Sequence, residues 1–194
     1  MSSRPKIIDY DPTWPEQFEL VAARVREALA DLDYSVEHIG STAVPGLAAK
    51  DVIDVMAVVG NESDLVEAAQ ALAAAGWTVR PPGMNDHPVP GLAADPREWM
   101  KRFAHEPHGV RRTNVHVRIE GRANHRYAIL FRDFLKAHPD EASRYAEAKR
   151  GLAALCDSTG QYAEEKDPVC DLIYLSAERW AEEVGWQPPL RPTS

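Results

Sequence analysis

The chain has 194 residues, of which 44% are hydrophobic and 27% are charged. These proportions are typical of a soluble globular protein and exclude a collagen, a coiled coil or a fully disordered chain. Its 22 basic and 30 acidic side chains give a net charge of −8, which argues against a general binder of nucleic acids or anionic membranes. No run approaches the roughly 20 apolar residues of a membrane-spanning helix. No signal peptide is recognisable, so we expect a cytoplasmic protein.

The two cysteines, Cys156 and Cys170, form no CxxC or zinc-binding spacing, which favours a reducing compartment. The sequence leaves open one disulfide between them, although two inert packing residues are the commoner case. At this length we expect a single domain over residues 1–186, followed by a disordered proline-rich tail over 187–194.

Basic side chains gather between Arg97 and Arg126, where eight of them accompany three acids. A cationic segment in an anionic protein favours a small phosphorylated or carboxylated ligand, because a focused positive potential concentrates anions. The alternative is a solvated hairpin with scattered arginines.

The N-terminal part of the chain predicts two helices and three strands. Apolar residues recur at steps of three or four through a predicted helix over 13–32, which opens with the spacing of a capping box over 13–16. An alanine-rich helix, capped by Asn61 or Ser63, is expected to end near Ala75. Apolar and β-branched runs predict strands over 34–39, 52–59 and 77–80.

The C-terminal part predicts a long loop, two strands and three helices. Five prolines and two glycines over 81–96 indicate a loop that is long enough to act as a lid or flap. Strands are predicted over 98–105 and 112–120, and helices over 124–137, over 140–156 and over a last segment that ends near Glu183. Asp167 and Pro168 have the pattern of a helix start. Together these elements predict an α+β fold, a mixed β-sheet flanked by helices with a helical C-terminal third.

The segment over 38–54 carries the strongest functional pattern. A glycine before Ser41 lets the backbone approach a ligand, and the hydroxyls of Ser41 and Thr42 can donate to phosphate oxygens. Asp54 interrupts an apolar strand, where a carboxylate needs a cation, hydrogen bonds or the end of the sheet. Mg²⁺ would suit it, since this ion takes carboxylate oxygens and bridges phosphates. The alternative is a plain turn, with Asp54 paired to Lys50 or an arginine.

Other residues have two interpretations each. His116 stands on the polar face of its strand, which favours a functional role, whereas His38 either braces the loop or contacts a ligand. Tyr162 and Lys166 would share a face of a helix, where Lys166 is either a phosphate contact or a surface charge. Four aromatic residues fall at core spacing rather than forming a platform for a base: Trp14, Phe18, Phe131 and Phe134.

Several familiar motifs are absent from the sequence. There is no GxxxxGKS/T or GxGxxG, so a P-loop kinase and a Rossmann domain have no support. There is also no HExxH or GxSxG, which leaves a zinc protease and an α/β-hydrolase without support.

A set of motifs in a fixed order resembles the GrpB family. They are YDPTWPEQF at 10–18, HIGSTAVPGL at 38–47 with Lys50 and Asp54, VHV at 115–117, FRDFL at 131–135 and YAEEK at 162–166. The likeness covers about residues 8 to 180. Related domains are fused to dephospho-CoA kinases in some bacteria, and the family is similar to the nucleotidyltransferase superfamily.

The resemblance implies a nucleotidyltransferase-like fold in which Gly40 and Ser41 contact nucleotide phosphates and Asp54 is the first acid of an Asp-x-Asp/Glu pair. The second acid would stand at position 56, where this chain has Met56. Methionine is a poor ligand for magnesium, so a transfer reaction that uses two metal ions lacks one of its acids. Asp51 and Glu37 are the candidates to replace it.

These patterns lead to two leading hypotheses and a third behind them. The chain is either an enzyme of Mg²⁺-dependent nucleotidyl or phosphoryl transfer, or a binder of a nucleotide or another phosphorylated small molecule without catalysis. A protein-interaction scaffold is the third. We predict Asp54 and His116 as catalytic residues, with Asp54 also holding the metal. The predicted binding residues are His38, Gly40, Ser41, Thr42, Lys50, Arg111, Arg112, Arg118, Tyr162 and Lys166.

Overall fold

The fold is described from a computed structural model, which covers residues 4–83, 85–107 and 109–189. The elements follow one another in the order α1 (Trp14–Ala28), β1 (Tyr34–Ile39), β2 (Ile53–Val59), α2 (Glu62–Ala74), β3 (Thr78–Val79), β4 (Arg102–His105), β5 (Thr113–Ile119), α3 (Ala123–Ala137), α4 (Pro139–Leu155) and α5 (Thr159–Val184). Short 3₁₀ turns lie at Ser41–Ala43 and Pro96–Trp99. The predicted α+β class and the helical C-terminal third are confirmed.

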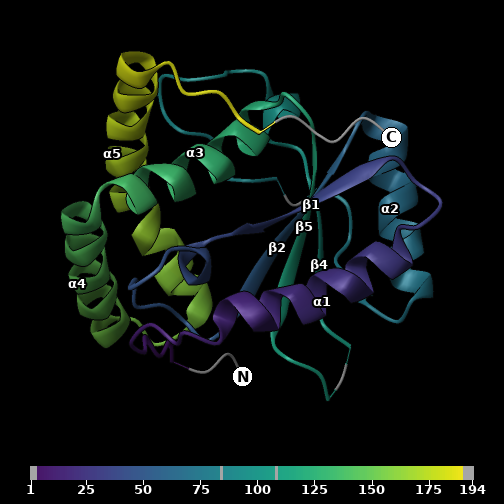
Figure 1. Ribbon diagram of the computed structural model, residues 1–194, viewed down its shortest axis with the longest axis horizontal. Helices are drawn as coiled ribbons and strands as arrows, with labels where there is room; N and C mark the ends of the chain where they lie inside the picture. Colours follow the sequence, from purple (N-terminus) through teal and green to yellow (C-terminus); the bar gives the residue numbers. More distant parts are fainter. Residues whose placement is uncertain (1–3, 84, 108, 190–194) are drawn as a thin grey trace.

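The five strands form one mixed sheet in the order β1-β2-β5-β4-β3. Only β2 and β5 run parallel, and the other three pairs are antiparallel. In the parallel pair Asp54 lies opposite Asn114, and Met56 lies opposite His116. Helices α1 and α2 cover one face of the sheet, whereas α3, α4 and α5 form a second helical layer beside the other face (Figure 1).

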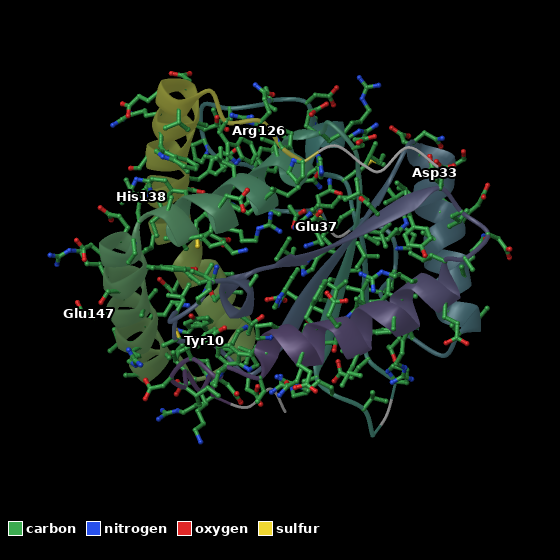
Figure 2. All side chains as sticks on the ribbon, in the orientation of Figure 1. Tyr10, Asp33, Glu37, Arg126, His138 and Glu147 are labelled. Atoms are coloured by element: carbon green, nitrogen blue, oxygen red, sulfur yellow. The ribbon has the colours of Figure 1, made fainter. Side chains whose placement is uncertain are left out.

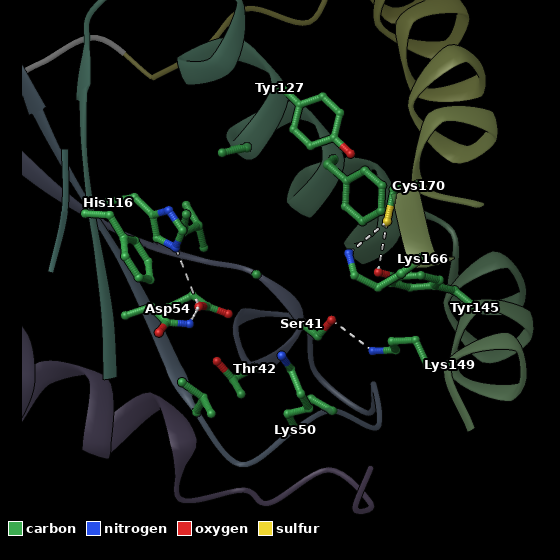
Figure 3. A pocket seen from close by; sticks show the side chains of 18 of the residues that line it. Ser41, Thr42, Lys50, Asp54, His116, Tyr127, Tyr145, Lys149, Lys166 and Cys170 are labelled. Carbon is green, nitrogen blue, oxygen red and sulfur yellow. Dashed lines mark hydrogen bonds and ion pairs between the residues drawn. The ribbon is translucent and has the colours of Figure 1, made fainter. Parts of the chain in front are cut away.

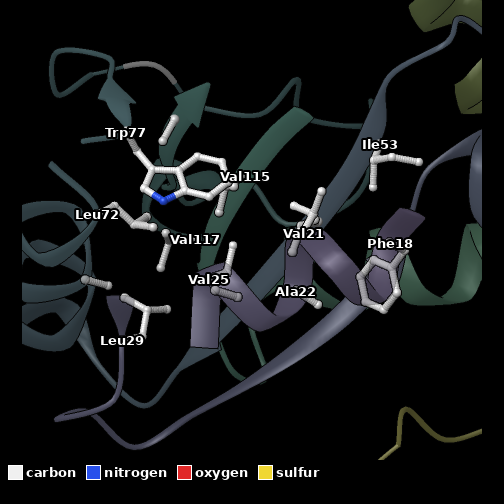
Figure 4. Packing of buried hydrophobic residues seen from close by; sticks show 14 of the residues in the cluster. Phe18, Val21, Ala22, Val25, Leu29, Ile53, Leu72, Trp77, Val115 and Val117 are labelled. Atoms are coloured by element: carbon white, nitrogen blue, oxygen red, sulfur yellow. The ribbon is translucent and has the colours of Figure 1, made fainter. Parts of the chain in front are cut away.

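The face below α1 and α2 is the main hydrophobic core. Alternate residues of β2, from Ile53 to Val59, point to this side together with Val115 and Val117 of β5. They pack against the apolar stripe of α1 and against Leu72 of α2 (Figure 4). Because side chains alternate along a strand, the same register sends Asp54 to the opposite face.

The three C-terminal helices have their own hydrophobic core. The residues that they contribute include Leu130 and Phe134 of α3, Tyr145 of α4, and Tyr174 and Ala177 of α5. On the sheet side of α3, Ala128 and Ile129 pack against Met56 and Val58. The helical layer is thus fixed to the sheet along α3, and the space beside that contact stays open for a cavity.

The start of the last helix differs from the prediction. Helix α5 begins at Thr159, where the Ser158 hydroxyl accepts a hydrogen bond from the backbone amide of Gln161, and Pro168 lies inside the helix. A proline inside a helix removes one backbone donor. The carbonyl deprived of that donor is the one of Glu164, an exposed residue that water can reach. The helix therefore continues, and Tyr162 and Lys166 lie on it together.

Two other local predictions need correction. The capping box over 13–16 does not form, because the Thr13 hydroxyl donates to Asp11 instead of capping the helix. The strand predicted over 98–105 begins only at Arg102, since residues up to Trp99 form a 3₁₀ turn. Both cysteines are free, so the disulfide left open by the sequence is not formed.

The proline-rich loop predicted over 81–96 is anchored on the sheet. Asp86 forms ion pairs with Lys101 at 2.6 Å and with Arg118 at 2.8 Å, and Val89 is buried among the C-terminal helices. Position 84 of this loop and most of the predicted tail, 190–194, lie outside the described residues. In the part of the chain that is described, no helix combines the length and the apolar composition needed to cross a bilayer.

Candidate functional site

A cavity of about 350 Å³ opens between the polar face of the sheet and the three C-terminal helices. We call it the central cavity (Figure 3). The strands and the 3₁₀ turn contribute Gly40, Ser41, Thr42, Asp54, Phe103, Asn114, His116 and Arg118. The helices contribute Tyr127, Phe131, Tyr145, Lys149, Tyr162, Lys166 and Cys170, and the loops add Lys50 and Lys101.

Gly40 has to be a glycine because it lies directly against Asp54. Its φ is +71°, and a Cβ at this position would come within 2.4 Å of Asp54 Oδ2. The chain turns here from β1 into the 3₁₀ segment that carries Ser41 and Thr42. The glycine thus places the two hydroxyls next to the carboxylate.

Asp54 is held by two neighbours on β5. Asn114 Nδ2 donates to Asp54 Oδ1 at 2.7 Å, and His116 Nε2 lies 3.7 Å from the same oxygen. Burial alone would raise the pKa of Asp54, but the contacts with His116 and Asn114 and the charge of Lys50 lower it. Asp54 is therefore an ionised carboxylate at neutral pH.

His116 is a neutral imidazole. Burial lowers its pKa to about 4, and the cations Lys101 and Arg118 act in the same direction, against the effect of the nearby Asp54 carboxylate. Its Nδ1 atom is buried and finds no hydrogen-bond partner within the described residues. The neutral imidazole thus has an unused acceptor atom, Nδ1, but its lowered pKa makes it a weak base at neutral pH.

The second acid of the Asp-x-Asp/Glu pair has no counterpart among the described residues that line the central cavity. Met56 is fully buried under α3, and its sulfur lies 3.4 Å from Arg118 Nη1. Neither proposed substitute lines the central cavity. Asp51 pairs with Arg111, and Glu37 lies under α3, where it accepts a hydrogen bond from Arg132 at 2.8 Å (Figure 2).

This donor set does not fit a pair of Mg²⁺ ions. Within the described ranges, no group of three or more His, Cys, Asp or Glu side chains is placed to hold a metal. Among the described residues that line the central cavity, Asp54 is the only carboxylate, and two bridging ions need more than one.

Cations dominate the central cavity instead. Its lining holds four lysines and one arginine: Lys50, Lys101, Lys149, Lys166 and Arg118. Lys101 and Arg118 are already paired with Asp86, whereas Lys50 lies 5.4 Å from the centre of the Tyr162 ring. Burial lowers the pKa of Lys50, although the charge of Asp54 acts against this. Two deeper lysines, Lys149 and Lys166, stand on the helices.

Lys166 and Lys149 have different surroundings. Lys166 Nζ donates to Cys170 Sγ at 3.1 Å, and although burial disfavours its charge, Cys170 raises the pKa of Lys166 overall. Lys149 Nζ lies 2.9 Å from Ser41 Oγ and also donates to the Ala48 carbonyl. Burial lowers the pKa of Lys149 to about 7.

Three of the predicted binding residues do not line the central cavity. His38 braces the loop: its Nε2 lies 3.0 Å from Thr42 Oγ1, and its ring stacks on Phe18 at 4.4 Å. Burial lowers the pKa of His38 to about 4, so it is neutral at pH 7. Arg111 donates to Gln17 of α1 and to Asp51 of the loop before β2, and Arg112 is likewise absent from the lining.

Sequence reasoning missed several lining residues. Tyr145 and Lys149 stand four positions apart on α4, on the same side as the buried Ala142 and Ala146. A lysine within an apolar helix stripe was the available signal, since lysine is rarely buried without a partner. Phe131, predicted as core, lines the central cavity, and so does Cys170.

The chain resembles proteins of one family over most of its length. Residues 4–175 match the model of the GrpB protein family. A UPF0157 protein of Halalkalibacterium halodurans is 34% identical over 76% of this chain and 68% of its own length. The crystal structure of a conserved protein GrpB from Enterococcus faecalis superposes with a TM-score of 0.69 at 28% identity, covering 90% of this chain and 99% of that chain.

Other relatives are longer or more distant. A protein of Mycolicibacterium paratuberculosis named dephospho-CoA kinase is 32% identical over 94% of this chain. The chain spans about half the length of that relative, 48%. A structure of a cytoplasmic RNA terminal U-transferase matches with a TM-score of 0.47 at 13% identity, over 72% of this chain and 39% of that chain, which is too low to indicate a shared activity. On the family match and the identity to its curated relatives, this chain belongs to the GrpB family.

Proposed function

We propose that the central cavity binds a small phosphorylated molecule, with a nucleotide as the first candidate, and that its lysines take the place of divalent metal ions. The observation that carries the proposal is the charge of the lining, in which four lysines and an arginine accompany one carboxylate. Clustered cations in a concave site raise the local concentration of anions.

Lys50 and Lys166 have no carboxylate in hydrogen-bond contact and would hold the phosphate groups, and Lys149, whose pKa is about 7, would join them in its protonated form. The hydrogen-bond partners of Lys149 are a hydroxyl and a carbonyl, that of Lys166 is a thiol, and Lys50 lies over the Tyr162 ring, so a phosphate would meet little competition from carboxylates. Lys101 and Arg118 are less available, because Asp86 occupies both. The Ser41 hydroxyl adds a donor at the same end of the central cavity.

The size and the walls of the central cavity suit the rest of such a ligand. A volume of about 350 Å³ lies within the roughly 300–1,000 Å³ of small-molecule sites. Tyr127 and Phe131 stand parallel on α3, with ring centres 5.7 Å apart and planes 22° from each other. Aromatic faces of this kind stack well on a nucleobase.

Calorimetric titration tests the proposal. ATP, UTP, AMP and inorganic pyrophosphate are titrated into the protein with Mg²⁺ and with EDTA. We expect at least one of them to bind, with the same affinity in both buffers. A charge-assisted hydrogen bond is worth about 1.5–3 kcal/mol, so Lys166→Met is expected to weaken binding roughly 10- to 150-fold.

The matched control is Lys6→Met, because Lys6 is an exposed lysine outside the central cavity. Its titration is expected to equal that of the unmodified protein. Absence of binding by all four compounds would overturn the proposal, and a strict requirement for Mg²⁺ would overturn its metal-free form.

One observation favours a second candidate, the Mg²⁺-assisted transfer of a nucleotidyl or phosphoryl group. Asp54 is ionised and adjoins Gly40 and the neutral His116, an arrangement that could hold a single ion together with ligand phosphates. This candidate predicts release of pyrophosphate or nucleoside monophosphate from an NTP and loss of that release in Asp54→Asn. An inactive protein across all four NTPs would exclude it.

A further inference from the structure

Ser41 and Lys149 form a close pair inside the central cavity. Lys149 reaches from α4 to place Nζ 2.9 Å from Ser41 Oγ, and its second partner is the carbonyl of Ala48 (Figure 3). Lys149 itself is only 2% exposed. Both partners of this amine are uncharged, which is unusual for a buried lysine.

The surroundings of Lys149 favour the neutral amine. Burial lowers its pKa to about 7, and the nearby cations Lys166 of α5 and Arg150 of α4 act in the same direction. Cys170 of α5 and Asp54 of β2 act against them, and the face of the Tyr145 ring lies 4.5 Å from Nζ. A neutral amine can accept the proton of a serine hydroxyl while it donates to a backbone carbonyl.

We propose that Ser41 is a nucleophile, that Lys149 is its general base, and that the pair cleaves an ester of an anionic small molecule through an acyl-serine. A base in contact with a serine hydroxyl is the arrangement that activates it, and serine–lysine pairs are a recognised variant of the serine–histidine one. The anionic class of the substrate rests on the cation-lined binding function proposed above, whereas the nucleophile does not.

The reaction conserves atoms and charge without an added cofactor. As Ser41 Oγ attacks the ester carbonyl, its proton passes to Lys149 Nζ, and the bond between the carbonyl carbon and the leaving oxygen breaks. Lys149 gives the proton to the departing alkoxide, which leaves as an alcohol. Water then attacks the acyl-serine while Lys149 takes one of its protons. The carboxylic acid leaves, and the Ser41 hydroxyl receives that proton back.

Tyr145 supports this chemistry as a positioning residue. Its hydroxyl hydrogen-bonds with Cys170 Sγ at 3.3 Å, and a side-chain hydrogen bond with Ser41 acts on its pKa against the effect of burial. Burial raises the pKa of Tyr145 well above the usual range, so it keeps its proton and stays a donor at neutral pH. It lies four residues before Lys149 on the same face of α4, so one helix places both groups at the serine.

The test is covalent labelling followed by intact-mass measurement and peptide mapping. The full chain is incubated with the neutral ester para-nitrophenyl acetate and with the anionic mono-para-nitrophenyl succinate. We expect an acyl group on Ser41 and release of para-nitrophenol, with a rate that rises with pH through a midpoint near 7. Electrostatic attraction is expected to make the succinate react about 10-fold faster or more.

Three variants test whether Lys149 acts as a general base or only contacts phosphate. Ser41→Ala removes the label, and Lys149→Met lowers the labelling rate about 100-fold or more, as expected for a general base. Lys149→Arg supplies a permanent positive charge but cannot act as a base at this pH, so it should bind nucleotide in calorimetry and yet fail to label. Ser176→Ala, on the exposed side of α5, is the matched control and labels like the unmodified protein.

Each outcome decides a separate part of the proposal. A label on a lysine or tyrosine instead of Ser41, or an unchanged rate in Lys149→Met, overturns the nucleophile and its base. Because the wild-type pH profile needs no variant, a flat profile between pH 5 and 9 overturns the base even if Lys149→Met does not fold. Equal rates for the two esters overturn the anionic substrate, and nucleotide binding without any labelling leaves the proposed function standing while this inference falls.

Discussion

The two faces of the sheet use the same strands for opposite purposes. On one face, Val55, Val115 and Val117 are fully buried against α1 and α2, and the packing there is mostly apolar, although Thr113 of β5 is buried on the same side. On the other face, the alternate residues Asp54 and Asn114 meet lysines from helices and loops around a cavity. Successive residues of one strand point to opposite faces of the sheet. The same strands therefore supply both the hydrophobic core and the polar lining of the central cavity.

The two faces of the sheet therefore contribute differently to the free energy of folding. The apolar face gains stability from burial, at about 25 cal/mol for each Å² removed from water. The polar face buries charges whose desolvation costs free energy, and it recovers that cost only in part through hydrogen bonds. Substitutions on the first face should therefore change stability and spare binding, whereas substitutions on the second should change binding as well as stability.

The largest effect is expected on the apolar face, from Leu29→Ala. Leu29 follows α1 directly and is fully buried, so its truncation leaves a cavity and should cost about 2–5 kcal/mol of unfolding free energy. Urea denaturation measures the loss, and calorimetry should find nucleotide binding unchanged. Leu20→Ala is the control on the same helix, because Leu20 is 67% exposed and should cost less than about 0.5 kcal/mol.

The free energy of unfolding should depend on pH because of His116 on the polar face, which should contribute at most about 3 kcal/mol. Burial lowers its pKa from 6.5 to about 4, so below pH 6.5 the unfolded chain binds a proton that the folded chain does not. Stability therefore falls as the pH drops from 6.5 toward 4. His116→Gln should flatten this part of a plot of unfolding free energy against pH.

His38 gives the same direction over the same range, since burial also lowers its pKa to about 4. The double variant His38→Gln with His116→Gln should therefore show a weaker dependence than either single variant. A wild-type protein that is equally stable at pH 4.5 and pH 6.5 would contradict the neutral, buried state of both imidazoles.

Position 40 tests how closely the loop approaches the polar face. Gly40→Ala combines a strained positive φ with an overlap against Asp54 Oδ2, and we expect a loss of about 2 kcal/mol together with loss of ligand binding. Gly46→Ala is the matched control. Its φ is +78° but nothing lies within 4 Å of the added Cβ, so it should cost only about 1 kcal/mol and leave binding intact.

Two strands were predicted closely from their apolar and β-branched residues. The strand Tyr34–Ile39 was predicted at its full length, and the strand over Ile53–Val59 within one residue. The sequence identified the segment around Gly40 and Ser41 as a candidate site from residue types alone. It identified Asp54 and His116, on neighbouring strands, in the same way. Alternation predicts which side of its strand each residue faces, whereas the pairing of β2 with β5, which brings them together, is a long-range contact.

The helical side of the central cavity was harder to predict, for two physical reasons. Lys149 and Tyr145 reach Ser41 from more than 100 positions away in the chain, and no local pattern encodes that distance. Asp167 and Pro168 suggested a helix start, whereas tertiary packing of Cys170, Tyr174 and Ala177 extends α5 through the proline. Packing overrode a local preference, and the same helix then brought Lys166 into the central cavity.

The smallest predicted effect lies at the end of a helix on the apolar face, far from any ligand. Asn61 caps α2 by accepting hydrogen bonds from the backbone amides of Ser63 and Asp64. Asn61→Ala removes both and should cost about 1 kcal/mol, whereas Asn61→Asp keeps the acceptor and should cost little. Urea denaturation measures both variants, and calorimetry should find unchanged nucleotide affinity in each. A change in affinity here would mean that the two faces are coupled through β2, and the separation of stability from binding would fail.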